Sequence, residues 1–410
     1  MTKLTADTTT EKCIRRKVLI LSAAVAGGHD AMARNLKMDI ENAEHSAVIV
    51  DGLALMSRTL NWFLISTYAW QLRNAPWILG ITFRLTGLRS SVATSRVLVG
   101  WLCGRRLLRA IERERPDVIV STYPVVTAGL GRLVKAGRLR QPVLATVTDY
   151  GAHAMWVSPE IDLHLVLSKR SAEMVELAGG RARVAKLPVG DGFSAGAVPT
   201  RRQARASLGI ADDAFVALIV GGAWGIGDIE GMADRVAEAG VSSIIVTGQN
   251  EELSARLTER FRATPAMRVI GWTNRMPLLM AASDCLIQNA GGITCLEAIE
   301  VGLPIIFFRP IPGHGKLNAR MMVAAAAARA ADSDRALQAL LRDAACGQTA
   351  LPTAELEPRC DAAAAVLSAT PTRSSHGSAA GCTMVRARLD PDRSQDTKAE
   401  GETGRYAKVG

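Results

Sequence analysis

The sequence predicts an α/β protein that contains two parallel sheets, each covered by helices on both faces. Three observations support this prediction. Short apolar runs recur along the chain, segments of helical length separate them, and glycine pairs follow several of the runs. Continuous apolar runs are typical of strands buried on both faces of a parallel sheet, and regular strand–helix alternation is the pattern of doubly wound sheets. At 410 residues the chain is long enough for two domains.

The first series of strands and helices fills the N-terminal half. Its predicted strands are short and rich in aliphatic residues, and they span 17–24, 47–51, 118–121, 143–148, 163–166 and 184–187. The predicted helices between them span 31–43, 97–115 and 126–135. Residues 1–12 are polar and are expected to be disordered.

The second series follows a segment rich in Gly, Pro, Ala and Arg at 190–213. Its predicted strands span 215–220, 243–246, 268–270, 285–288 and 305–308, and its predicted helices span 229–239, 251–261, 276–282, 293–301, 318–329 and 334–342. We therefore expect domains at 14–195 and 196–345, a further helix within 346–369 and a disordered tail at 370–410. Sites in such sheets lie at the C-terminal ends of the strands, so two Rossmann-like domains that face each other form a cleft.

Cysteine usage and charge narrow the class of protein. The seven cysteines include no C-x-x-C pair, which argues against a disulfide framework or a zinc site and favours a reducing cytoplasm. The net charge is +10, and between Arg84 and Arg140 the chain has 12 basic residues against three acidic ones. This stretch is either a solvated helix face or a surface that meets an anionic membrane. Nucleic acid is not an expected partner, because aromatic residues make up only 4% of the chain.

Residues 60–79 form an aromatic segment. It contains Trp62, Phe63, Tyr68, Trp70 and Trp77. Charged residues at 58 and 73 leave it too short to span a bilayer. Two interpretations stay open: an amphipathic segment that lies at a membrane interface and admits a lipid tail, or a helix packed on the sheet.

A strand, a glycine pair and a helix start follow one another at 285–301. Gly291 and Gly292 allow the backbone to approach a ligand closely, and the helix start presents free backbone N–H groups, a geometry that binds phosphate. Thr294 adds a hydroxyl. Glu297 lies one turn further on the same face, where its carboxylate can accept hydrogen bonds from ribose hydroxyls. The pattern predicts a nucleotide-sugar site.

The run Gly-Gly-Ile-Thr-Cys-Leu-Glu-Ala from Gly291, followed by Gly-Leu-Pro, resembles the donor-binding motif of glycosyltransferase family 28. This family includes monogalactosyldiacylglycerol synthases and processive diacylglycerol glucosyltransferases. The resemblance covers roughly residues 17–330 and implies the two-domain arrangement called GT-B. It implies further donor contacts at Gly222, Trp272, Thr273, Pro312, Gly313, His314 and Asn318. His314 stands where relatives often have Gln or Glu, so the identity of the hexose stays open.

The first predicted strand leads into the turn Gly27-Gly28-His29-Asp30. The G-x-G-x-x-G spacing is absent, which argues against an NAD-dependent dehydrogenase. The family 28 turn closes with Gly-Gly-His, and the resemblance implies that His29 is the general base. A histidine titrates near neutral pH, and the positive end of a helix favours its unprotonated form. The alternative is a structural role for His29.

Asp149, His153 and Trp156 follow the strand at 143–148. They resemble the Thr-Asp-aromatic…His…Trp motif of the glycolipid-forming branch of the family. The resemblance implies that these three residues, together with Gly27 and Gly28, lie on the acceptor side of the cleft. The alternative is that Asp149 caps a turn and His153 is a packed surface group.

Taken together, the resemblance implies an inverting glycosyltransferase that moves a hexose from a UDP-sugar to a lipid hydroxyl, with diacylglycerol as the expected acceptor. It implies no metal and no cofactor. We expect the protein in the cytoplasm, bound peripherally to the inner face of the cell membrane through residues 84–140 and 60–79. Two alternatives stay open: a polyprenyl-linked or small natural-product acceptor, or a non-catalytic regulator that binds lipid or nucleotide.

Overall fold

The structure is a computed structural model that describes residues 15–23, 25, 27–55, 58–87, 104–194, 196–353 and 360–371. The side chains of residues 58–60, 63 and 64 are also outside this description. The predicted disorder at 1–12 and in the tail from 372 onward, three of the seven cysteines and part of the basic stretch lie outside the described residues. Those expectations stay predictions.

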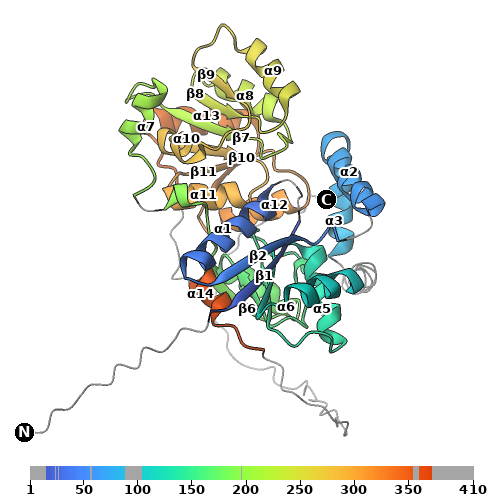
Figure 1. The fold of residues 1–410 in the computed structure, drawn as a ribbon. Helices are drawn as coiled ribbons and strands as arrows, with labels where there is room; N and C mark the ends of the chain where they lie inside the picture. The colour runs from blue at the N-terminus through green and yellow to red at the C-terminus, as the bar shows by residue number, and fades with distance from the viewer. Residues whose placement is uncertain are drawn as a thin grey trace, which may run out of the picture. The chain divides into compact units, whose positions relative to one another are not determined.

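The N-terminal half forms one parallel sheet (Figure 1). Among the described residues its strands run in the order β13-β6-β5-β4-β3-β1-β2. Six of them come from this half: β1 (Lys17–Ser22), β2 (Ser46–Asp51), β3 (Val118–Ser121), β4 (Val143–Thr146), β5 (Leu163–Val166) and β6 (Ala182–Lys186). The order reverses between β1 and β3, so loops that leave these two strands diverge at a topological switch point.

Helices separate the strands, as predicted. They are α1 (Gly28–Asn42), α2 (Arg58–Asn74), α3 (Pro76–Thr86), a helical segment at 104–114, α5 (Pro124–Lys135), α6 (Lys169–Leu177) and the single turns η1 (Ala154–Trp156) and η2 (Asp191–Phe193). The aromatic segment at 60–79 is therefore not one helix. It breaks at Ala75 because Pro76 begins α3, and proline fits the first turn of a helix but not its interior.

The C-terminal half forms a second parallel sheet, whose strands among the described residues run β12-β11-β10-β7-β8-β9. The strands are β7 (Val216–Val220), β8 (Ser242–Val246), β9 (Met267–Ile270), β10 (Cys285–Gln288), β11 (Ile305–Phe308) and β12 (Arg329–Ala331). Numbered within this half, the order is the doubly wound 3-2-1-4-5-6, with its switch point between β7 and β10. The predicted architecture of two doubly wound sheets is confirmed.

The helices of this half are α7 (Arg201–Leu208), α8 (Ile229–Glu238), α9 (Glu251–Arg260), α10 (Met276–Ala282), α11 (Ile293–Val301), α12 (His314–Ala324) and α13 (Asp334–Ala345). The prediction of a helix at 318–329 was wrong at its end. A left-handed residue, Ala326 (φ 52°), ends the helical course, and Arg329–Ala331 pairs with β11 as strand β12. Pairing at the sheet edge thus overrides the helix propensity of an alanine-rich run.

The chain then returns to the N-terminal sheet. Strand β13 (Cys360–Asp361) pairs with β6, and α14 (Ala362–Leu367) packs against α1. The helix predicted within 346–369 is therefore short and follows this added strand. Asp361 caps it by accepting a hydrogen bond from the backbone N–H of Ala364 at 2.7 Å.

Both faces of each sheet are covered by apolar side chains. In β1, Val18 and Ile20 join one hydrophobic cluster while Leu19 and Leu21 join another, and all four are fully buried. This arrangement explains the continuous apolar runs in the sequence, because alternate residues of a strand point to opposite faces of the sheet.

Candidate functional site

A cavity of about 680 Å³ lies at the C-terminal ends of strands from both sheets. Gly28 and Tyr123, which line it, follow the strands at the N-terminal switch point, and Gly222 and Gly291 follow the strands at the C-terminal one. The two switch points therefore meet at one cavity, which is where doubly wound sheets bind ligands.

The loop after β10 forms one wall of the cavity. Gly291 has φ 93° and Gly292 has φ 74°, a region of backbone conformation that favours glycine. Gly292 is the N-cap residue of α11 and makes no side-chain cap. The first N–H groups of α11 are therefore available to an anion at the positive end of the helix dipole.

Thr294 and Glu297 line the same cavity from the first turn of α11 and the turn after it. Burial raises the pKa of Glu297 to about 8, since a charged carboxylate loses solvation there. A ligand hydroxyl that donates a hydrogen bond to Glu297 would stabilise its charged form. Such a group fits the ribose-binding role that the sequence predicted for Glu297.

The loops on the C-terminal side of the cavity hold one another in place. Asn289 donates a hydrogen bond to the backbone oxygen of Ile226 at 2.9 Å, so the loop after β10 is joined to the loop after β7. Gly227 makes this contact possible, because a Cβ atom there would lie only 1.9 Å from the Asn289 amide nitrogen.

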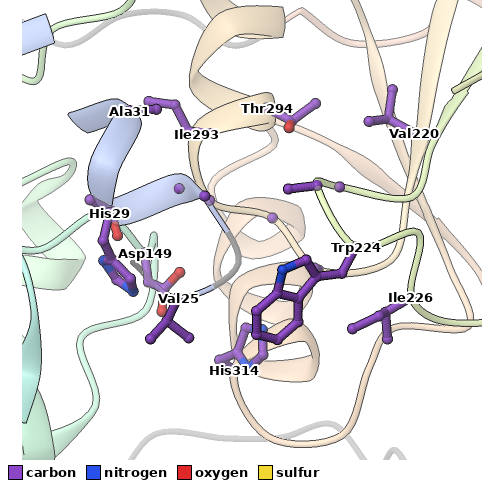
Figure 2. Close-up of a pocket in the computed structure, with 18 of the residues that line it drawn as sticks. Val25, His29, Ala31, Asp149, Val220, Trp224, Ile226, Ile293, Thr294 and His314 are labelled. Atoms are coloured by element: carbon purple, nitrogen blue, oxygen red, sulfur yellow. The ribbon is translucent and has the colours of Figure 1, made fainter. Parts of the chain in front are cut away.

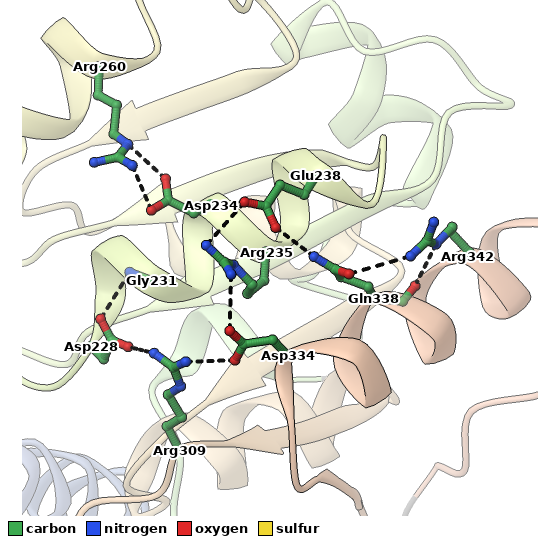
Figure 3. Close-up of polar contacts among 10 residues, drawn as sticks. All are labelled: Asp228, Gly231, Asp234, Arg235, Glu238, Arg260, Arg309, Asp334, Gln338 and Arg342. Carbon is green, nitrogen blue, oxygen red and sulfur yellow. Dashed lines mark hydrogen bonds and ion pairs between the residues drawn. The ribbon is translucent and has the colours of Figure 1, made fainter.

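Ion pairs join the loops after β7 and β11 to α13 (Figure 3). Arg309, which follows β11 and has φ 47°, pairs with Asp228 and, at 2.6 Å, with Asp334. Asp228 caps α8 by accepting a hydrogen bond from Gly231, and Asp334 begins α13 and also pairs with Arg235 at 3.0 Å. These groups are partly exposed, so each pair contributes little stability by itself. Together the pairs connect the end of β11 with α8 and α13.

His29 lies in the first turn of α1, after Gly27, which has φ 79°. Burial lowers the pKa of His29, while the nearby Asp149 carboxylate acts in the opposite direction. Its Nδ1 atom is buried and has no hydrogen-bond partner among the described residues. Figure 2 shows the His29 ring beside the Asp149 carboxyl group, with His314 and Trp224 contributed by the C-terminal half. The imidazole is thus neutral at pH 7 and adjoins a group that would stabilise its protonated form.

His153 fixes the loop after β4 against α3. Its Nε2 atom lies 3.0 Å from the backbone oxygen of Phe83, and its Nδ1 atom accepts a hydrogen bond from Met155 at 3.2 Å. Together these bonds require the Nε2-protonated tautomer. Burial lowers the pKa of His153, which favours this neutral form. His153 lines the cavity, but both of its ring nitrogens are already occupied.

The aromatic segment supplies an apolar wall. Tyr68 and Leu72 of α2 and Leu79 and Phe83 of α3 line the cavity. The opposite side of α3 is exposed, and Trp77, Ile81 and Leu85 form a stripe on it at helical spacing. Within the described residues, none of the helices combines the length and apolar character needed to cross a bilayer.

Most residues singled out from the sequence come together here. Those that line the cavity are Gly27, Gly28, His29, Asp149, His153, Trp156, Gly222, Trp272, Thr273, Gly291, Gly292, Thr294, Glu297 and His314. Pro312, Gly313 and Asn318 are not among the described lining residues. A Cβ atom on Gly313 would meet the Phe83 ring at 3.2 Å, and Asn318 is only 1% exposed.

Sequence reasoning missed two aromatic groups of the site. Tyr123 packs edge-on against His29, with ring centroids 5.0 Å apart, and Trp224 lines the cavity beside Tyr68. Tyr123 follows the C-terminal end of β3, and this position was the signal that could have identified it. Within the described residues, no cluster of three or more His, Cys, Asp or Glu side chains could hold a metal ion. The expected absence of a metal stays a prediction.

Two family models match this chain. The model of monogalactosyldiacylglycerol (MGDG) synthase matches residues 29–185, and the model of the glycosyltransferase family 28 C-terminal domain matches residues 217–354. The first contains His29 and the second contains the Gly291–Gly292 loop.

Curated relatives and solved structures are also similar. A processive diacylglycerol beta-glucosyltransferase of Bacillus licheniformis is 26% identical over 320 residues, which cover 74% of this chain and 80% of the relative. One of Staphylococcus epidermidis is 23% identical over 312 residues, which cover 74% of this chain and 78% of the relative.

Among solved structures, the spinosyn rhamnosyltransferase SpnG has a TM-score of 0.51 at 16% identity. The matched region covers 81% of this chain and 92% of the SpnG chain. The glycosyltransferase SnogD of Streptomyces nogalater has a TM-score of 0.50 at 15% identity, and the matched region covers 85% of this chain and 98% of the SnogD chain. These likenesses support the GT-B fold. The N-terminal half thus matches the MGDG synthase model and the C-terminal half matches the model of the glycosyltransferase family 28 C-terminal domain.

Proposed function

We propose that the protein transfers a hexose from a UDP-sugar to a lipid hydroxyl, with diacylglycerol as the acceptor and with inversion at the anomeric carbon. The observation that carries the proposal is the placement of His29 and the Gly291–Gly292 loop at one cavity, each at the start of a helix and each from a different sheet. A base and an anion-binding loop on opposite sides of a cleft suit a single displacement.

The donor half of the proposal rests on α11. Its free N–H groups would bind the diphosphate, and Glu297 would accept hydrogen bonds from the ribose. Trp272, Thr273 and His314 line the cavity near these groups and are proposed contacts of the uracil and the hexose. When the bond between the anomeric carbon and UDP breaks, the same N–H groups would stabilise the charge that develops on the leaving diphosphate.

The acceptor half rests on His29. Its lowered pKa leaves the imidazole unprotonated and able to take the proton of the acceptor hydroxyl as the hydroxyl oxygen attacks the anomeric carbon. Asp149 would stabilise the imidazolium that forms. The named relatives are beta-glucosyltransferases, and a β product from an α-linked donor requires inversion.

The lipid acceptor is supported by the apolar wall of α2 and α3 and by the diacylglycerol named in both relatives. We propose that the exposed stripe on α3 meets the bilayer and that the exposed Arg105, Arg106 and Arg109 of the helix at 104–114 meet anionic headgroups of the inner leaflet.

The test is a transfer assay with anionic vesicles that contain diacylglycerol and a panel of UDP-sugars, with matched vesicles that lack diacylglycerol. We expect UDP release and a new glycolipid with one of the sugars. Release of UDP without glycolipid would keep the donor assignment and point to a polyprenyl-linked or small acceptor. UDP binding without turnover would favour a regulator, and the absence of any UDP binding would overturn the donor site.

A further inference from the structure

Asn318 lies near the start of α12 and does not line the cavity. Both polar atoms of its side chain form hydrogen bonds. Its amide nitrogen donates to Asp149 Oδ1 at 2.9 Å and to the backbone oxygen of Ala290 at 3.1 Å. Its amide oxygen accepts from the backbone N–H of Gly151 at 3.1 Å. The residue is 1% exposed, so no solvent competes for these bonds.

The partners of Asn318 come from the two site loops. Asp149 and Gly151 belong to the loop after β4 in the N-terminal sheet, and Ala290 belongs to the glycine loop after β10 in the C-terminal sheet. One neutral side chain therefore joins the loop that carries the carboxylate to the loop that precedes the proposed phosphate site.

Close packing around Asn318 leaves little room for other arrangements. A Cβ atom on Gly291 would lie 2.8 Å from the Asn318 amide nitrogen, and a Cβ atom on Gly151 would lie 2.4 Å from Leu317 Cγ. Both contacts are shorter than real Cβ contacts, so glycine is required on each loop where it meets α12. Asn318 and Leu317 thus set the position of both loops.

Among the charged groups near His29, the Asp149 carboxylate has the largest effect in favour of the protonated imidazole. The groups that face His29 are Asp149, Asp30 of its own helix, His314 of α12, the backbone of Thr122 and the rings of Tyr123 and Trp156. Asp149 favours the protonated imidazole and His314 opposes it. An amide can orient Asp149 Oδ1 without cancelling its charge, whereas Lys or Arg in its place would neutralise the carboxylate that His29 requires.

We propose that Asn318 is a positioning residue that holds the Asp149 carboxylate toward His29 and ties it to the donor loop at Ala290. The consequence for catalysis rests on the proposed function. His29 is oriented to act as the base when Asn318 joins the loop after β4 to the loop after β10. Asn318 acts through Asp149, and it does not touch the reacting atoms.

The test is a titration of the histidine side chains by NMR in the full-length protein. The chain has only six histidines, and loss of one signal in a His29→Gln variant assigns His29. In Asn318→Ala the carboxylate is released, so the pKa of His29 should fall by about 0.5 to 1 unit. Arg320→Ala changes an exposed residue of the same helix and should leave the His29 titration unchanged.

A double-mutant cycle shows whether Asn318 acts through Asp149. In an Asp149→Asn background, Asn318→Ala should produce no further fall in the His29 pKa. An unchanged pKa in the single variant, or an equal fall in both backgrounds, would overturn the proposal. If Asn318→Ala does not fold, as judged by thermal unfolding, Asn318→Ser is measured by the same criteria.

The titration needs no turnover, so it tests the role of Asn318 even if the protein proves not to be a transferase. Where transfer is observed, kcat of Asn318→Ala should fall about 10- to 100-fold, and the acid limb of its pH profile should move to lower pH with the His29 pKa. Two results together would overturn the proposal by showing a merely structural role for Asn318. The kcat of Asn318→Ala would fall only in proportion to the loss of folded protein, and the acid limb of its pH profile would not move.

Discussion

The two walls of the cavity are built in different ways. The C-terminal wall presents backbone at four glycines with positive φ angles, Gly222, Gly248, Gly291 and Gly292, beside the rings of Trp224, Trp272 and His314. The N-terminal wall is mostly side chain, and its rings are those of His29, Tyr68, Phe83, Tyr123, His153 and Trp156. Backbone N–H groups suit a diphosphate, whereas rings suit an apolar acceptor and proton transfer.

Under the proposed function, this difference divides donor binding and chemistry between the two halves of the chain. Changes on the C-terminal wall should act on UDP affinity, and changes on the N-terminal wall should act on turnover or on the acceptor. Each prediction below tests this division.

The largest effect is expected from His29→Ala on the N-terminal wall. Turnover should fall about 1,000-fold, since general base catalysis contributes on that order. The measurement is kcat in the vesicle assay. A variant that keeps full turnover would show that His29 is not the base.

On the C-terminal wall, Gly291→Ala should weaken UDP binding about 100-fold, because its Cβ atom would press against Asn318 and displace the donor loop. Gly347→Ala is the matched control: Gly347 has φ 70°, but a Cβ atom there meets nothing within 4 Å. The control shares the backbone cost and should bind UDP normally. Equal UDP affinities for the two variants would contradict the role of the loop.

Glu297 should make stability depend on pH. The folded protein keeps this proton up to a pKa of about 8, whereas a model glutamate loses it near 4.5. The folded state therefore holds more protons between these values, and the free energy of unfolding should fall as the pH rises from 5 to 8.

Glu297→Gln should remove this slope and be more stable than the parent at pH 8, by on the order of 4 kcal/mol, while matching it near pH 4.5. The measurement is denaturant unfolding at both pH values. Parallel pH curves for the two proteins would mean that the carboxyl is not buried as described.

The smallest effect is expected on the outer surface of the N-terminal wall. Trp77 is 63% exposed on α3, and Trp77→Ala should weaken binding to anionic vesicles about three- to tenfold. The control is Leu177→Ala, at a residue that is 79% exposed on α6. Sedimentation with vesicles measures both variants, and an equal loss in both would argue against a membrane face on α3.

The C-terminal wall was the more predictable one, for a physical reason. Gly291, Gly292, Thr294 and Glu297 are close in sequence, and the strand–turn–helix geometry that uses them is local. The rings of the N-terminal wall come from five separate loops and helices. Tyr123 was therefore missed, and the contacts of Asn318 with Asp149, 169 positions away, have no local signal. Trp224, which lies on the C-terminal wall, was missed as well.

Secondary structure failed where tertiary pairing decided it. Strand β12 forms from an alanine-rich run because the edge of β11 is available to it, and β13 forms because the chain returns to β6. Neither partner lies nearby in the sequence. The break between α2 and α3 was not predicted either, although Pro76 was a local signal for it.

The most direct test of the division between the walls is a calorimetric titration with UDP of the parent protein, His29→Ala and Glu297→Ala. We predict that His29→Ala binds UDP as the parent does, and that Glu297→Ala binds it at least about tenfold more weakly, as expected for lost hydrogen bonds to the ribose. Unchanged affinity in Glu297→Ala, or a loss of affinity confined to His29→Ala, would contradict the assignment of the donor to the C-terminal wall.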